Sequence, residues 1–122
     1  MTEAEIIASW TSLTEISATA TAIYLSLVSG YLVVAYVAGK NLEKLQLIVV
    51  NTLFVIAAEW HAFASAMHGS LGAEMASRLD PSQGDTAPAI MFWGWFTLLS
   101  CGVVACIYFM HKTRQLDDGG AT

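Results

Sequence analysis

Two titratable residues, Glu59 and His61, lie within a long apolar segment of the sequence. Counted from Lys44 with the α-helical rise, Glu59 lies roughly 22 Å and His61 roughly 25 Å along a helix. Because the hydrocarbon core of a bilayer is about 30 Å thick, both would lie in the membrane half opposite Lys44. A charged side chain inside a membrane costs about 2.5–3.5 kcal/mol, so it is kept when paired, neutralised or exposed to water. Glu59 is therefore the first candidate for a ligand, proton or ion site, and His61 is the second.

The other two apolar segments place hydroxyl and aromatic side chains at about the depth of Glu59. Counted back from Gly39 and from Lys112 with the same rise, these side chains are Tyr24, Thr21, Thr97 and Trp95. We expect Glu59 or His61 to contact one of them. A hydrogen bond to a tyrosine or threonine would lock helix packing, whereas a carboxylate facing water or a ligand would serve a proton, an ion, a quinone or a haem.

The spacing of the titratable residues argues against metal binding and catalysis. Glu59 and His61 are two residues apart, hence about 200° around a helix, so they cannot share a partner. His68 shares a face with His61 but lies about 10 Å away along the axis, too far for one metal ion. Cys101 and Cys106 are about 140° apart and are expected to behave as small apolar residues that do not pair. We predict no metal site and no catalytic constellation.

The elements that must position these residues are three long apolar runs. Of the 122 residues, 56% are hydrophobic and 12% are charged, against about 25% charged residues in soluble domains. About 20 apolar residues span a bilayer. We predict an all-α integral membrane protein with three transmembrane helices in an up-down-up bundle, preceded by a short amphipathic N-terminal helix. The expected elements are an outer amphipathic segment at 1–14, spans at 16–38, 45–66 and 89–110, an outer loop at 67–86, and a cytoplasmic tail at 111–122.

Capping and glycine signals set these boundaries. Thr2 with Glu5, and Ser12 with Glu15, have the spacing of capping boxes. One helix is therefore expected to begin near Thr2, and it either continues into the first span or gives way to a second helix that begins near Ser12. Gly69 is expected to end the second helix, because glycine is common just after helix ends. The first 15 residues contain three acidic residues and no basic one, so we expect no cleavable secretory signal.

The basic residues predict the orientation. Lys40 and Lys44 lie between the first two runs, and Lys112 and Arg114 follow the third, whereas only Arg78 lies on the other side. Basic residues near membrane spans stay in the cytoplasm. We therefore expect a multi-pass protein of the plasma (inner) membrane, with its N-terminus outside and its C-terminus in the cytoplasm.

Rows of small residues predict how the helices associate. Lipid tails are as apolar as leucine, so close backbone approach and hydrogen bonds must hold membrane helices together. Asn51, in the inner half of the membrane, is expected to hydrogen-bond another helix. The rows either hold the bundle together or form contacts between subunits. They are Ala18, Ala22, Ser26 and Gly30 in the first run, Ala58, Ala62 and Ala66 in the second, and Gly94 and Gly102 in the third.

These features favour a small oligomeric or accessory subunit of a membrane complex. The net charge of −5 argues against nucleic acid as a partner, since that needs a basic face. The expected partners are the lipid bilayer and either further copies of the chain or another membrane subunit. Two alternatives stay open: a homo-oligomeric channel or transporter with Glu59 in its path, and a haem- or quinone-binding redox anchor. The sequence specifies no cofactor and no enzymatic activity.

Overall fold

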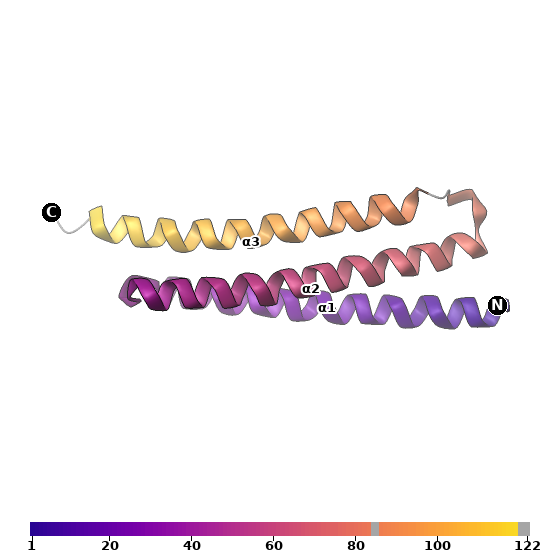
Figure 1. The fold of residues 1–122 in the computed structure, drawn as a ribbon, viewed down its shortest axis with the longest axis horizontal. Coiled ribbons are helices and arrows are strands. Elements are labelled where there is room, and N and C mark those ends of the chain that lie inside the picture. The colour runs from indigo at the N-terminus through magenta and orange to yellow at the C-terminus, as the bar shows by residue number, and fades with distance from the viewer. Residues whose placement is uncertain (84–85, 120–122) are drawn as a thin grey trace.

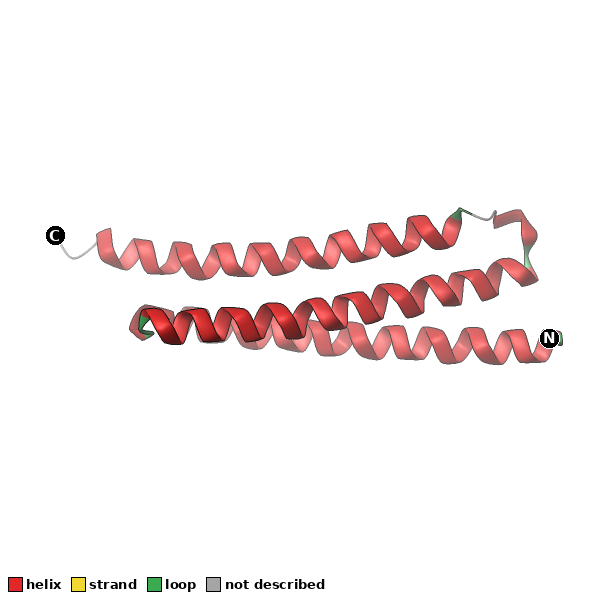
Figure 2. Cartoon of the chain, in the orientation of Figure 1, coloured by secondary structure: helices red, strands yellow, loops and turns green. Residues whose placement is uncertain are grey.

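The computed structural model describes residues 1–83 and 86–119. Within these ranges the chain is helical and contains no strand (Figure 2). The elements in order are helix α1 (Glu3–Val37), the 3-10 turn η1 (Gly39–Asn41), helix α2 (Lys44–Leu79), the 3-10 turn η2 (Pro81–Gln83) and helix α3 (Ala87–Gly119).

The three helices lie along the long axis of the molecule (Figure 1). The η1 turn and the end of α3 lie at one end, and the N-terminus and η2 lie at the other. Helix α2 packs against both neighbours, and contact between α1 and α3 is less extensive. Two hydrogen bonds to α3, Tyr24–Leu99 and Arg114–Gly39, each join residues 75 apart in sequence. The segment from Tyr24 to Gly39 therefore runs alongside α3 in a constant register.

Each helix is long and apolar enough to cross a membrane, as the sequence predicts. The α1 helix has 35 residues and α2 has 36, so each is more than 50 Å long at about 1.5 Å per residue. Both are longer than the hydrocarbon core of about 30 Å. To fit such a core, the helices would have to tilt or extend beyond it at their ends.

The separate N-terminal helix predicted for residues 1–14 does not form, because α1 runs without a break from Glu3 to Val37. The predicted capping box of Thr2 and Glu5 is present: the Thr2 backbone N–H donates to Glu5 at 2.6 Å, and the Glu5 N–H donates to Thr2 Oγ1 at 3.3 Å. Ser12 lies inside the helix and caps nothing. A capping box can begin a new helix only where the backbone of its first residue is not helical, and here the helical path continues.

The predicted end of the second helix at Gly69 is also wrong, because α2 continues to Leu79. Gly69 and Gly72 do not end the helix; they lie where α1 passes close by. A Cβ on Gly69 would be 3.2 Å from Ser17 Oγ, and one on Gly72 would be 3.6 Å from Thr14 Oγ1. The expected loop at 67–86 is therefore shorter, and its residues 84 and 85 lie outside the described part.

The tail predicted at 111–122 is helical as far as Gly119, because α3 extends nine residues beyond Met110; residues 120–122 lie outside the described part. In this last part of α3, polar side chains form hydrogen bonds to groups one turn away in the same helix. Thr113 Oγ1 donates to the Phe109 carbonyl at 2.9 Å, and Gln115 Nε2 lies 3.0 Å from His111 Nε2.

The core is a column of side chains between the helices. Alanines on α2 let the neighbouring backbones approach, and Tyr31 stacks on Phe54 with 4.0 Å between ring centroids. Both cysteines are free; Cys106 is buried and Cys101 is exposed. The buried residues are Ala20, Tyr24, Tyr31 and Ala35 on α1, Gly39 in η1, Phe54, Ala58, Ala62, Ser65, Ala66 and Gly72 on α2, and Leu99, Val103, Cys106 and Met110 on α3.

Arg114 joins the end of α3 to the η1 turn. Its Nη1 donates to the carbonyl oxygens of Gly39 at 2.8 Å and of Leu42 at 2.9 Å. Gly39 is buried there, and a Cβ at this position would lie 2.8 Å from the sulfur of Met110. Since the last carbonyls of a helix lack partners within it, the guanidinium group completes the hydrogen bonding where the chain turns.

We predict that Arg114→Gln lowers the free energy of unfolding by about 1–3 kcal/mol, because hydrogen bonds from a charged donor to the turn are lost. Lys112→Gln removes the same charge from an exposed neighbour and should change stability by less than about 0.5 kcal/mol. Denaturant titration in detergent micelles, followed by circular dichroism, measures both. Equal losses in the two variants would contradict the role given to Arg114.

Candidate functional site

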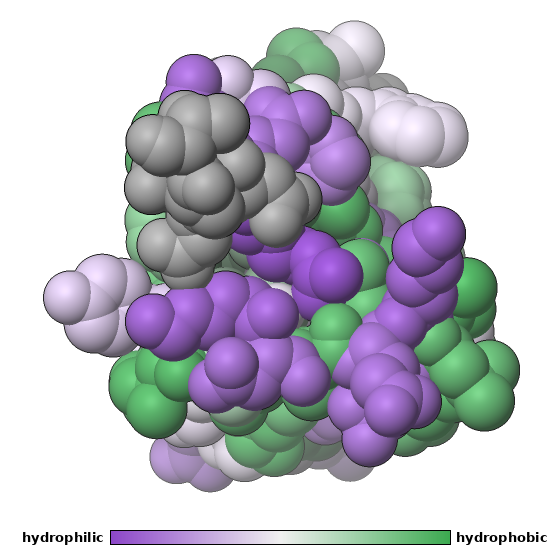
Figure 3. Space-filling view, turned by 90° about the vertical axis from the view of Figure 1, so that its left-hand side faces the viewer, coloured by the Kyte–Doolittle hydropathy of each residue, from purple (hydrophilic) through white to green (hydrophobic). Residues whose placement is uncertain are grey.

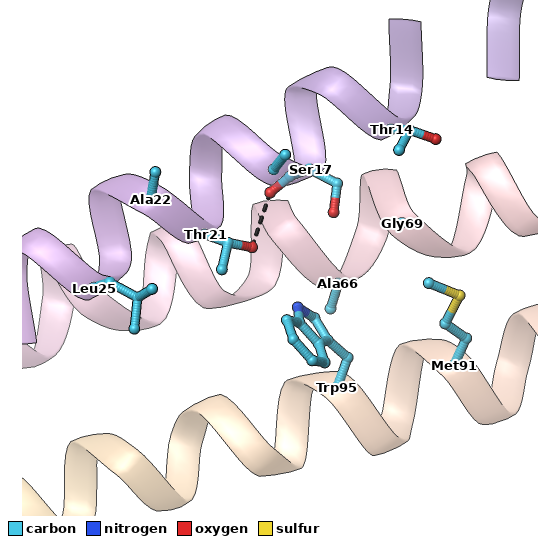
Figure 4. A pocket seen from close by; sticks show the side chains of 10 residues that line it. Thr14, Ser17, Thr21, Ala22, Leu25, Ala66, Gly69, Met91 and Trp95 are labelled. Atoms are coloured by element: carbon cyan, nitrogen blue, oxygen red, sulfur yellow. Dashed lines mark hydrogen bonds between the residues drawn. The ribbon is translucent and has the colours of Figure 1, made fainter. Parts of the chain in front are cut away.

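Ser65 is a fully buried polar residue at the centre of the three helices. Its hydroxyl oxygen lies 2.6 Å from Thr21 Oγ1 of α1 and 2.9 Å from Trp95 Nε1 of α3. Its backbone carbonyl accepts a hydrogen bond of 2.9 Å from Ser17 Oγ. Figure 4 shows Ser17 and Thr21 on α1 facing the indole of Trp95. One short side chain of α2 thus contacts both other helices.

The hydrogen bonds around Ser65 have a definite direction. The Trp95 indole can only donate, so it donates to the Ser65 hydroxyl oxygen. The Thr21 hydroxyl donates to the Ser17 carbonyl at 2.9 Å (Figure 4). Since Thr21 has a single hydroxyl hydrogen, Ser65 must donate to Thr21. The chain of donors therefore runs from α3 through α2 to α1.

This network is complete and uncharged. Among the described residues no buried side-chain nitrogen or oxygen lacks a hydrogen-bond partner. An unpaired polar group away from water costs about 1–3 kcal/mol, so the network strongly favours this rotation of each helix. Hydroxyl and indole groups without a base or a charged partner have no activated nucleophile. The arrangement serves to fix the packing of the helices.

Tyr24 forms a second contact between α1 and α3. Its ring is buried and its hydroxyl donates to the Leu99 carbonyl. The hydroxyl lies against Gly102, where a Cβ would be only 2.5 Å from the tyrosine oxygen. Gly102, predicted as part of a packing or oligomer face, thus makes room for Tyr24 within the chain.

Glu59 is half-buried and accepts a hydrogen bond of 2.9 Å from Ser100 Oγ of α3. The partners expected at its depth bond elsewhere: Tyr24 bonds Leu99 and Thr21 bonds Ser65. Ser100 was missed, although a count back from Lys112 puts it roughly 18 Å deep, only slightly nearer that surface than Glu59. A hydrogen bond between this carboxylate and a hydroxyl group is what a role in helix packing requires. It favours neither the channel or transporter nor the redox anchor.

The histidines bond to their own helix. His61 Nδ1 lies 2.8 Å from the Ala57 carbonyl, and His68 Nδ1 lies 2.7 Å from the Ala64 carbonyl. His61 therefore does not bond to Glu59. Thr97, another partner expected at the depth of Glu59, is exposed. Within the described ranges, no cluster of three histidine, cysteine, aspartate or glutamate residues is arranged to hold a metal ion.

Asn51 contacts another helix, as the sequence predicts. Tyr31 of α1 donates to its Oδ1 at 2.7 Å. Polar contacts between helices thus occur at three levels of the bundle, at Asn51, at Glu59 and at Ser65.

The rows of small residues differ in exposure. On α2, Ala58, Ala62 and Ala66 are at most 1% exposed, so that row packs within the chain. The α1 row is exposed at every position, as is Gly94, beside which a Cβ would contact nothing. We call the residues Ala18, Ala22, Ser26 and Gly30 the α1 row. Sequence spacing alone could not separate the two kinds of row.

The α1 row borders two grooves. Ala18 and Ala22 line a groove of about 420 Å³ that also contacts Ala66, Met91 and Trp95 (Figure 4). Ser26 and Gly30 line another of about 390 Å³, beside Phe54 of α2. Both are walled mainly by apolar side chains.

The fold and the site together define a bundle of three candidate membrane spans, fixed internally by hydrogen bonds and exposing one row of small residues. Comparison with protein-family models, with curated proteins and with solved structures finds no match.

We predict that Gly102→Ala destabilises the protein by about 1–3 kcal/mol, because the new methyl group would overlap the Tyr24 hydroxyl. In a Tyr24→Phe background the same change should cost much less, since the nearest remaining ring carbon would be 3.7 Å away. Unfolding of the wild type, both single variants and the double variant gives the coupling. Additive effects would contradict the contact.

Proposed function

We propose that this protein is a multi-pass integral membrane protein that acts as an oligomeric or accessory subunit, and that the α1 row is the face that binds its neighbour. The observation that carries the proposal is the exposure of this row. In a membrane, small residues bring helix backbones together and so provide the contact area that lipid cannot replace.

The position of the α1 row on its helix supports an intermolecular role. Ala22 and Ser26 each lie two residues from buried Tyr24, hence about 160° around the helix. The middle of the row therefore points away from the buried face of α1, while its two ends border the grooves shared with α2 and α3. Ser26 Oγ donates to the Ala22 carbonyl at 2.9 Å, so its hydroxyl is satisfied and does not oppose contact with an apolar partner.

The proposed placement is an up-down-up bundle in the plasma membrane, with the N-terminus outside. Lys40 and Lys44 near η1 and Lys112 near the end of α3 support it, because cytoplasmic segments are enriched in lysine and arginine. Counted from Lys44 and Lys112, Trp60, Trp93 and Trp95 lie roughly 24–29 Å along their helices. This is near the outer edge of a core of about 30 Å, where an aromatic belt would contact the outer headgroups.

The orientation predicts which end an impermeant reagent reaches. In a background carrying Cys101→Ser and Cys106→Ala, we expect a membrane-impermeant maleimide to label Ser82→Cys on intact cells or spheroplasts and to leave Asn41→Cys unlabelled. Both positions are exposed, so permeabilised membranes should give labelling of both. Selective labelling of Asn41→Cys in intact cells would reverse the proposed orientation.

The α1 row predicts an assembly sensitive to side-chain size. We expect the purified chain in mild detergent, or with its partner subunit, to have a mass above that of the 13.1 kDa monomer. Ala22→Leu or Gly30→Leu should weaken association about tenfold or more, because the larger side chains separate the backbones. Light scattering over a concentration series measures it.

The matched control is Ala105→Leu, which enlarges an exposed alanine on α3 outside the row. It should leave association unchanged. A wild-type chain that is monomeric at all concentrations and recovers no partner from native membranes would rule out the proposal, as would equal effects of the control and the row variants.

A further inference from the structure

A groove at the η1 end lies between the end of α1 and α3. It has a volume of about 630 Å³ and is lined by Tyr36, Val37, Lys40, Phe109, Thr113 and Leu116. Its walls are largely apolar and aromatic, and Lys40 is its charged residue. Tyr36 and Leu116 are strongly exposed, at 74% and 69%, so the groove is open to the surroundings.

Within the described part of the chain, no ion pair involves the lysines at this end. The ion pair of the described residues, Arg78–Glu74, lies at the other end of the molecule. Glu43, which is close in sequence to Lys40, accepts a backbone N–H in the capping box that begins α2. Lys40, Lys44 and Lys112 are exposed, and hydrophilic residues gather over this end (Figure 3).

Arg114 is already engaged, so Lys40 is the cation free to serve the groove. The Arg114 guanidinium group is held by the Gly39 and Leu42 carbonyls. The Thr113 hydroxyl donates to the Phe109 carbonyl, so it remains an acceptor. Lys40 and the phenol of Tyr36 are the groups at the groove that can donate to an anion.

We propose that this groove binds an anionic phospholipid, with its phosphate at Lys40 and Tyr36 and an acyl chain along the apolar wall. The inference rests on the membrane placement proposed above. Phe109 is seven residues before Leu116 on α3, about 10 Å nearer the membrane interior. The groove therefore runs from the headgroup level toward the hydrocarbon. Basic pockets between membrane helices on the cytoplasmic side are suited to anionic headgroups.

The test is native mass spectrometry of the full chain in mild detergent, with equal amounts of phosphatidylglycerol and phosphatidylcholine. We expect wild type to retain phosphatidylglycerol preferentially. Lys40→Gln should reduce this preference about fivefold, while Lys44→Gln, which removes the same charge from outside the groove, should keep it. Thr113→Phe fills the groove without changing charge and should lose the preference, with folding verified by circular dichroism.

Three results would overturn the inference: no preference in wild type, an equal loss in Lys44→Gln and Lys40→Gln, or displacement of the lipid by excess glycerol 3-phosphate. An equal loss would indicate general attraction to this end, and displacement would indicate a site for phosphate alone. The same spectra report the mass of the protein assembly, so failure of lipid binding is distinguishable from failure of the proposed association.

Discussion

The close approach of α1 to α2 is the constraint on which the rest of the bundle depends. Three alanines on α2 are almost completely buried, and no larger side chain fits at these positions without separating the helices. Only at this spacing can Ser65, whose side chain is short, reach Thr21 at 2.6 Å. The indole of Trp95 then spans the remaining distance from α3. Small apolar residues set the separation, and the hydrogen bonds set the rotation.

The polar residues fall into two groups, those that bond to another helix and those that bond within their own. Ser65, Tyr24 and Asn51 bond across helices and are part of the packing. His61 bonds the carbonyl of its own preceding turn, which lets a titratable ring remain in an apolar helix without an external partner. Glu59 has one hydroxyl donor, Ser100, while its residue remains half-exposed.

The sequence predicts the existence of the three helices well, because long apolar runs have few alternatives. Their ends are predicted poorly, since Ser12 and Gly69 carry local signals that tertiary contacts override: Gly69 serves the approach of Ser17. Depth counting brings Glu59 to the correct level but cannot choose Ser100, because the choice depends on the rotation of α3. The buried and exposed rows on α2 and α1 look alike in sequence, since spacing defines a face but not what it contacts.

The α1 row belongs to one helix, and this has a consequence for the order of biogenesis. A binding face assembled from several helices exists only after all of them have been inserted. The face on α1 needs none of the later residues, and the contacts of Ser17 and Thr21 with Ser65 need only the first hairpin. Trp95 then adds the third helix, together with one wall of the groove beside Ala18 and Ala22. On the proposal that the α1 row binds a neighbouring subunit, that subunit could engage the nascent chain while α3 is still being synthesised.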